Sequence, residues 1–429
     1  MHATIWPATG SPIEDGTIIL QDGYIQAVGL ASEVEIPENA EVVDAEARIV
    51  TPGLIDTHSH MGVYATPHVE ATSDGNEATS PVTAEVWAAD SVWPQDPGLG
   101  RALAGGVTTI HVLPGSANLI GGRGVTLKLR LDGVRSVSDL RVANAPDTLK
   151  MACGENPKRV YGNRKTAPST LMGSVAGYRA AFQRAVEYRR TWMEWKGKQD
   201  AWAKKKQDKE KGKGAGQAPM PPSRDFSLDT LVSVLEGDTL VQMHCYRADE
   251  MVRMLELAQE FGFRIRSFHH AVEAYKIRDI LARADVAINT WPDWWGFKME
   301  AFDAIPENLA LVTAEGGRAV VHSDSAMLVQ RLNQEAAKGQ TAGRRSGIEI
   351  TDNQALRWIT AHAAWVLGLD GNLGTLEQGK VADVVIWSAN PLSVYSRADL
   401  VFVEGRLAYS RAMDPYGIRS DFEIDREGF

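Results

Sequence analysis

Two histidines one residue apart give the first indication of chemistry in this chain. His58 and His60 end the segment TPGLIDTHSH at positions 51–60. Residues two apart on a β-strand face the same side, so both imidazoles can bind one cation. Imidazole nitrogen is a good ligand for Zn²⁺ and related metals. Such pairs also occur on protein surfaces, but this one ends an apolar segment.

Three more candidates follow later strand-like segments. His244 and His270 each end such a segment, and Asp324 follows another at 319–322. His244 and His270 are 26 residues apart, about one strand-plus-helix unit, and Asp324 lies 54 residues further on, about two units. These spacings fit strands five, six and eight of a barrel, with residues 286–289 as strand seven. The active site of a barrel gathers at the C-terminal ends of its strands, so all five side chains are expected at one mouth, as in a metal hydrolase.

The surrounding elements predict an α/β fold. Apolar strands alternate with amphipathic helical patterns through the middle of the chain, which is typical of a parallel sheet and, at this length, of a (β/α)8 TIM barrel. Both ends are β-rich and contain hairpin signals such as Asp22-Gly23. We therefore expect a small β-sandwich domain formed by both termini. The predicted parts are residues 1–51 (sandwich), 52–370 (barrel), 371–410 (sandwich) and 411–429 (a C-terminal tail).

A charged insertion interrupts the barrel at about residues 192–224. It contains eight lysines between Lys196 and Lys213, followed by glycines and prolines. This composition predicts a solvated helical extension that ends in a flexible loop. A lid or a polyanion-binding arm is the functional alternative.

Composition and charge exclude several classes of protein. Of the 429 residues, 44% are hydrophobic and 23% charged, so the chain is neither disordered nor collagen-like. The net charge of −10 argues against a nucleic-acid partner. Without an apolar run of membrane length or a signal peptide, we expect no membrane partner and a cytoplasmic location, although the abrupt start at Met1 is compatible with missing upstream residues. With only two cysteines, we expect no disulfide framework and interpret Cys153 and Cys245 as buried apolar residues.

Together these segments resemble the amidohydrolase superfamily, in the branch that includes imidazolonepropionase-like proteins and metallo-dipeptidases. The resemblance spans nearly the whole chain and rests on residues 51–60, 106–109, His244, 270–273, 322–324 and 374–383. It implies that water activated by a divalent metal attacks an amide or similar carbon of a small-molecule substrate. The implied cofactor is one or two ions, with Zn²⁺ as the leading candidate, and a homo-oligomer is compatible with the family. The implied metal ligands are His58, His60, His244, His270 and Asp324, and Asp324 is also the catalytic proton acceptor.

Two ligand positions leave alternatives. His269 competes with His270, but Glu273 stands three residues after His270, as in the family. A two-metal site also needs a bridging ligand from strand three or four, which the family supplies as a carboxylated Lys or a Glu. Lys150 and Glu155 are the candidates, and we favour Glu155 because it needs no modification. A single metal without a bridge is the third option.

Softer candidates lie around the same mouth. The residues that could bind substrate are Arg159, Tyr161, His111 and Arg123, although surface salt bridges or turn formation explain them equally well. His322 could support Asp324 from the same face of its strand. The tryptophans at 291, 294 and 295 could wall an apolar or aromatic pocket, or could simply pack in the core.

Three functions follow from this interpretation. The first is a metal-dependent hydrolase that cleaves a C–N bond in an amide, a peptide-like compound or a cyclic amide. The second is a hydrolytic deaminase or imidazolonepropionase, but Arg247 stands where those relatives carry a glutamate. The third is a non-catalytic binding relative, which usually lacks metal ligands, whereas all five are present here.

Overall fold

The computed structural model describes residues 1–207 and 216–413. Most of the tail predicted at 411–429 and the centre of the charged insertion lie outside the described residues. Among the described helices, none combines the length and the apolar character needed to cross a membrane.

Eight strands form a barrel-like sheet in simple sequence order, from β5 to β12. They are β5 (Leu54–Ser59), β6 (Val107–Val112), β7 (Ile120–Lys128), β8 (Thr148–Ala152), β9 (Leu240–Cys245), β10 (Ile265–His270), β11 (Ala287–Thr290) and β12 (Ala319–Val321). Neighbouring strands are parallel, except that β7 runs antiparallel to both β6 and β8. The predicted TIM-like fold is therefore correct in outline, but the regular alternation fails at β7. The seven residues between β6 and β7 are too few for a crossover helix, so the chain must turn back.

Hydrogen bonds join the two edge strands, β5 and β12, near the carboxyl end of the sheet. The Asp324 N–H donates to the His58 carbonyl over 2.9 Å, and the Ser323 N–H donates to Asp56 Oδ1 over 3.0 Å. The carbonyls of residues 358 and 359 also accept hydrogen bonds from Val321 of β12 and Ile55 of β5, respectively. The first and last strands of the sheet are thereby held side by side.

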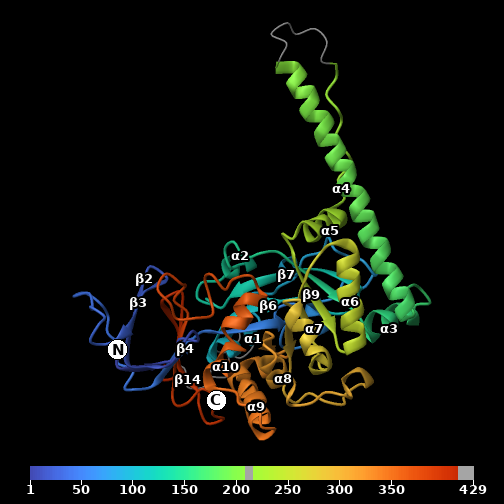
Figure 1. The fold of residues 1–429 in the computed structure, drawn as a ribbon. Helices are drawn as coiled ribbons and strands as arrows, with labels where there is room; N and C mark the ends of the chain where they lie inside the picture. The colour runs from blue at the N-terminus through green and yellow to red at the C-terminus, as the bar shows by residue number, and fades with distance from the viewer. Residues whose placement is uncertain (208–215, 414–429) are drawn as a thin grey trace.

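Helices cover the outside of the barrel (Figure 1). They are α1 (Pro97–Ala104), α2 (Val137–Leu140), α3 (Glu155–Asn163), α5 (Phe226–Glu236), α6 (Ala248–Phe261), α7 (Arg278–Arg283), α8 (Asn308–Ala314), α9 (Leu332–Arg345), α10 (Asp352–Arg357) and α11 (Ala361–Val366). Helix α4 (Leu171–Gln207) is different, because only its first half packs on the barrel and the rest projects away from it. The returning chain is fastened to it by indole hydrogen bonds from Trp195 to the Pro219 carbonyl and from Trp202 to the Gly216 carbonyl.

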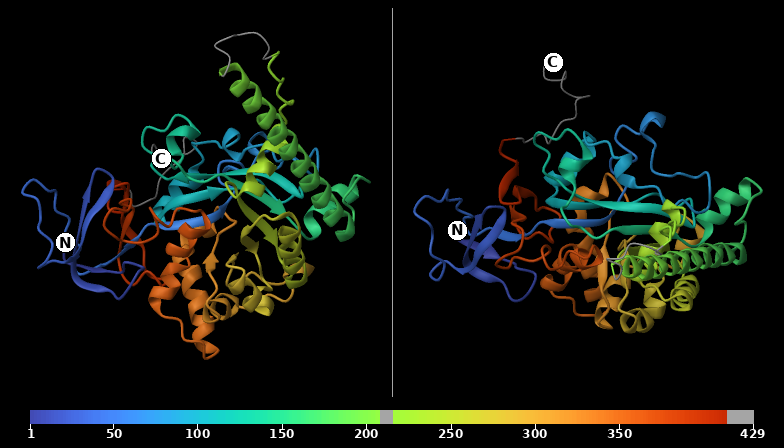
Figure 2. Two further views of the ribbon diagram at one scale, coloured as in Figure 1. Left: turned by 45° about the horizontal axis from the view of Figure 1, so that its top comes forward. Right: turned by 90° about the horizontal axis from the view of Figure 1, so that it is seen from above.

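Both ends of the chain form one seven-stranded sheet beside the barrel (Figure 2). In spatial order its strands are β15 (Arg406–Ser410), β14 (Ala398–Val403), β13 (Val384–Trp387), β4 (Ile49–Pro52), β1 (Ala3–Ile5), β2 (Ile13–Gln21) and β3 (Tyr24–Leu30). Asp383 connects this sheet to the barrel by accepting hydrogen bonds from the buried Lys128 ammonium and the Thr108 hydroxyl. The described strands from the two chain ends form one sheet, so the sandwich arrangement and the domain boundaries stay predictions.

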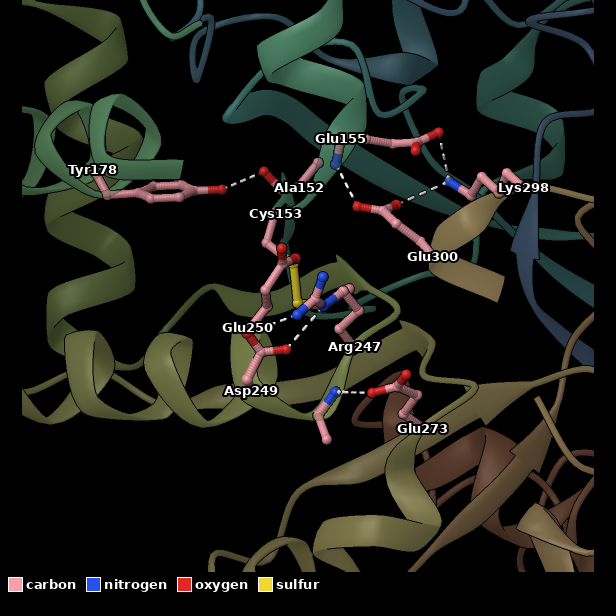
Figure 3. Close-up of a disulfide and its surroundings, with 12 residues drawn as sticks. Ala152, Cys153, Glu155, Tyr178, Arg247, Asp249, Glu250, Glu273, Lys298 and Glu300 are labelled. Atoms are coloured by element: carbon pink, nitrogen blue, oxygen red, sulfur yellow. Dashed lines mark hydrogen bonds and ion pairs between the residues drawn. A yellow bond between two sulfur atoms is a disulfide. The ribbon is translucent and has the colours of Figure 1, made fainter. Parts of the chain in front are cut away.

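A disulfide joins Cys153 and Cys245, as Figure 3 shows. Both cysteines are buried, as expected, but the interpretation of them as unbonded apolar residues was wrong. In the register of β8 and β9, Ala152 is paired with His244, so the two cysteines that follow are also neighbours, with their Cα atoms 5.2 Å apart. The two cysteines are 92 positions apart in the sequence, and the pairing of β8 with β9 brings them together.

Candidate metal centre

The five predicted ligands converge at the carboxyl end of the barrel sheet. His58 and His60 come from the end of β5, His244 from β9, His270 from β10, and Asp324 from the loop after β12. Asp324 Oδ1 lies 3.3 Å from His60 Nε2 and 3.7 Å from His58 Nε2, and its Oδ2 lies 3.9 Å from His270 Nδ1. The rings of His244 and His270 are 4.4 Å apart between centroids. The structure thus brings all five side chains together.

Several buried imidazole nitrogens in this cluster have no hydrogen-bond partner among the described residues. They are both ring nitrogens of His244, Nδ1 of His270 and both ring nitrogens of His322. Buried polar atoms are normally satisfied, so this concentration is unusual. Burial lowers the pKa of His244 and His270 well below the ordinary value, and positive neighbours such as Lys150 add to the effect for both rings. Neutral imidazoles with free lone pairs are the form that binds metal, so these residues fit a divalent ion.

A chain of hydrogen bonds sets the tautomer of His58. Gln242 donates its amide N–H to the Val366 carbonyl, so its Oε1 is left to accept from His269 Nε2 over 2.9 Å. His269 Nδ1 must then accept the proton of His58 Nδ1, 2.9 Å away. The lone pair of His58 Nε2 is consequently directed toward Asp324. His269 therefore lies behind the predicted ligand His58, and His270 is the residue that faces Asp324.

One further contact and two unusual backbone conformations constrain the site. His60 Nδ1 lies 2.8 Å from the Leu113 carbonyl and donates to it, which leaves His60 Nε2 free to face Asp324. The backbone φ angles of His270 and Asp324 are +71° and +47°, in the left-handed region that non-glycine residues rarely adopt. Such strained positions cluster at functional sites, because the surrounding fold must enforce them.

Lys150, rather than Glu155, reaches the histidine cluster. Its fully buried ammonium lies 3.3 Å from His58 Nε2 and 3.1 Å from the Pro114 carbonyl. Burial lowers the pKa of Lys150 to about 8. Glu155 instead begins helix α3, where its carboxylate lies 3.7 Å from Lys298 Nζ (Figure 3). This geometry goes against the sequence-based preference for Glu155.

The softer candidates are placed less favourably for substrate. His111 is buried between the hydroxyls of Thr126 and Thr148, each 3.0 Å away, and burial lowers its pKa to about 3. Tyr161 donates its hydroxyl hydrogen to the Asn118 amide over 2.6 Å. The Arg123 guanidinium carbon lies 4.9 Å from the centre of the Trp87 ring, and its buried Nε has no hydrogen-bond partner among the described residues. Arg159 is exposed on α3. None of the four belongs to the metal-ligating groups that the described residues form.

Sequence reasoning missed several residues of this site. The Tyr246 ring stacks on His270 at 4.9 Å, and Lys298 Nζ lies 3.8 Å above the Tyr246 ring. Gln242 and Tyr246 stand two residues before and after His244, so the alternation of a strand could have placed both on its face. Lys298 lies in a loop, where no such periodicity exists.

Comparisons with known proteins agree with this architecture. The model of the Amidohydrolase family (Amidohydro_3) matches residues 240–409. Amidohydrolase tasK of Hapsidospora irregularis is 33% identical over 94% of this chain, which spans 42% of that protein's length. An imidazolonepropionase of Sphingopyxis alaskensis is 24% identical over 87% of each chain. The crystal structure of an amidohydrolase from Thermotoga maritima is 33% identical, covers 96% of this chain and 99% of its own, and superposes with a TM-score of 0.81.

Proposed function

This chain belongs to the amidohydrolase superfamily, and we propose that it is a metal-dependent hydrolase of a C–N bond in an amide, a peptide-like compound or a cyclic amide. One observation carries the proposal. Four histidines and one aspartate from segments far apart in the sequence meet at one mouth, where several buried ring nitrogens have no hydrogen-bond partner among the described residues. The proposed substrate is a small molecule. The predictions of no nucleic-acid or membrane partner, of a homo-oligomer and of a cytoplasmic location stay untested.

His58, His60, His244, His270 and Asp324 would hold the ion, with Zn²⁺ as the leading candidate. A divalent metal supplies Lewis acidity, which lowers the pKa of water to about 7 and polarises a carbonyl group. If two ions bind, Lys150 is better placed than Glu155 to bridge them, provided that its amine is carboxylated. Carboxylation requires the neutral amine, and the lowered pKa of Lys150 makes that form available near neutral pH.

Asp324 would transfer the proton. Burial acts to raise the pKa of this carboxyl group, but the adjacent His60 ring and nearby positive groups such as Lys150 lower it overall, so the carboxylate is ionised. It can accept a proton from water at the start of the reaction and deliver it to the leaving nitrogen. The Ser323 N–H and hydroxyl, both bonded to Asp56, hold the preceding backbone and so fix the direction of the Asp324 side chain.

Hydrolysis of a heterocycle, as by a deaminase or an imidazolonepropionase, is the second candidate. The similarity to an imidazolonepropionase over 87% of both chains favours it. However, Arg247 occupies the position of the glutamate in those relatives, and its guanidinium is paired with Asp249 at 2.9 Å. Position 247 therefore offers no carboxylate that could transfer a proton to a substrate ring.

The substitution Asp324→Asn tests the proton-transfer role. We expect the rate on any substrate found among dipeptides, N-acyl amino acids, lactams and lactones to fall by at least about 10²-fold, while the circular dichroism spectrum stays that of a folded protein. Asp249→Asn is the matched control, because this exposed carboxylate is paired with Arg247 and is none of the five candidate ligands. Wild-type rates in the Asp324→Asn variant would refute the role.

A further inference from the structure

The loop between β11 and α8 carries an unusual set of exposed aromatic side chains next to the metal centre. Trp295, Phe297 and Phe302 are 63%, 55% and 57% exposed, and Met299 between them is 81% exposed. Large apolar side chains gathered in one exposed loop mark a binding surface in soluble proteins. Because this loop follows strand β11, it stands at the end of the barrel where the ligand cluster lies.

This aromatic surface is continuous with the predicted ligands. The Trp291 ring stacks on His270 at 4.7 Å and meets His322 edge-on at the same distance. Trp294 stacks on the other side of Trp291, again at 4.7 Å. With Tyr246, these rings belong to a small apolar cluster that is separate from the main core of the barrel. A ring bound against Trp294 would therefore extend the stack that runs from His270 through Trp291 and Trp294.

A cavity opens in this surface. It has a volume of about 320 Å³, at the lower end of the range for small-molecule sites, and is lined chiefly by Val272, Trp291, Pro292, Trp294, Trp295 and Ile305. Its polar side chains are already engaged. Asp293 pairs with Lys338 at 2.9 Å, and the Asn308 amide bonds the backbone of residues 271 and 275. The cavity therefore offers apolar walls without an unpaired charge.

A cation in the same loop, Lys298, is also neutralised. Lys298 Nζ lies 3.1 Å from Glu300 and 3.7 Å from Glu155, both carboxylates, as Figure 3 shows. A substrate carboxylate would have to displace these two groups. An uncharged ring, by contrast, meets only aromatic and aliphatic surface, which favours offset or edge-to-face packing.

We propose that the cavity lined by Trp291, Trp294 and Trp295 is a substrate subsite that binds an uncharged aromatic or similarly bulky apolar group carried on one side of the scissile bond. This inference rests on the proposed hydrolase function, because only a hydrolase would bind a substrate at this cavity. The binding preference itself can be measured without turnover.

The test is a comparison of two neutral probes, N-acetylphenylalanine amide and N-acetylalanine amide, in ligand-detected NMR titrations of the full chain. We expect the phenylalanine probe to bind at least about tenfold more tightly, as expected for burial of one ring. Trp295→Ala should weaken the phenylalanine probe about threefold to tenfold and leave the alanine probe unchanged. Trp294→Ala is the second variant, and Tyr395→Ala, at an 87% exposed position outside the cavity, is the control.

Equal affinities for the two probes, or a ring preference that survives both tryptophan substitutions, would overturn the subsite. A self-association measured by sedimentation that Trp295→Ala abolishes, without any ring preference, would overturn it as well, because a second copy would then cover this surface. Failure of the proposed function is distinguishable: the ring preference would persist while neither probe nor any amide in the panel is hydrolysed. If hydrolysis occurs, Trp295→Ala should raise KM for aromatic substrates and leave kcat unchanged.

Discussion

At the scale of single residues, Lys150 and Glu155 compete for the position that bridges two ions. Only Lys150 contacts the histidine cluster, 3.3 Å from His58, whereas the Glu155 carboxylate faces Lys298. A carboxylated lysine would bring a negative oxygen into a position that now holds an amine. The number of ions in the site therefore depends on this one side chain.

The pair Lys150→Met and Glu155→Gln separates the two alternatives. We expect Lys150→Met to remove one equivalent of bound metal and to reduce activity at least about 10²-fold, since loss of a ligand disables the ion that it holds. Glu155→Gln, the matched control, should keep the wild-type metal content and activity. Metal analysis by plasma mass spectrometry gives the readout. The opposite pattern would restore Glu155 as the bridging ligand.

Glu250 is a second residue whose environment makes a prediction. It is 5% exposed beside the disulfide, and burial, reinforced by the negative charge of Glu300, raises its pKa to about 7. Its Oε2 lies 3.2 Å from Cys153 Sγ, and because a disulfide sulfur carries no hydrogen, the proton of this contact must belong to Glu250. The fold thus prefers the protonated carboxyl group.

The stability of the protein should consequently fall as pH rises through the window from about 4.5 to about 7. The carboxyl group is protonated in both states below this window and ionised in both above it, so its contribution changes only between the two pKa values. Glu250→Gln removes this titration. Its free energy of unfolding relative to wild type should rise across the window by on the order of 1–2 kcal/mol, measured by urea unfolding. A pH-independent difference would refute the raised pKa.

The convergence of the five candidate ligands was largely predictable from residue type and spacing. His58 and His60 share a strand face, and the intervals to His270 and Asp324 match whole strand-plus-helix units. The choice between Lys150 and Glu155 was not predictable, because it depends on where helix α3 begins and which way its first turn points. The Glu155 carboxylate faces Lys298, a residue far away in the sequence, and no local sequence signal predicts that contact.

At the scale of elements, the strand order of the barrel was predictable and two of its features were not. Strand β7 reverses direction because the connection after β6 is short, and its glycines at positions 121, 122 and 124 are typical of a loop or turn rather than of a buried strand. The disulfide arises from the register of β8 against β9, which brings residues 92 positions apart into contact. Register is a property of the assembled sheet, so the sequence around each cysteine could not predict that the two would form a disulfide.

Removal of the disulfide should destabilise the protein. A cross-link between residues 92 positions apart restricts the unfolded chain, which in the loop-entropy account stabilises the fold by about 4–5 kcal/mol. We expect the double variant Cys153→Ala/Cys245→Ala to lose up to this amount in denaturant unfolding. Wild type under full reduction should approach the variant, and the variant itself should not respond to reductant.

Quantification of thiols in the unfolded, unreduced protein provides the control. Two alkylated cysteines per chain in that state would show that the bond does not form. A double variant within about 1 kcal/mol of wild type would contradict the stabilising role.

At the scale of the whole molecule, the ligand cluster is where the first and last strands of the barrel meet. His58 on β5 and Asp324 after β12 are linked by a backbone hydrogen bond of 2.9 Å, and their side chains approach to 3.7 Å. A bound ion would connect strands β5, β9, β10 and β12 at a single point. Sequence patterns predicted that both chain ends are β-rich, but the way in which β4 joins β1 to β13 depends on pairing across more than 300 residues.

The most direct test of the proposed metal centre is the metal content of the purified protein, followed through chelation and reconstitution. We expect one to two equivalents of a divalent transition ion, loss of hydrolysis when the ion is removed, and recovery when it is returned. We also expect that His244→Ala and His270→Ala lower the bound equivalents, whereas the surface substitution His2→Ala does not. Full hydrolytic activity in protein that has been stripped of metal would contradict the proposed metal centre.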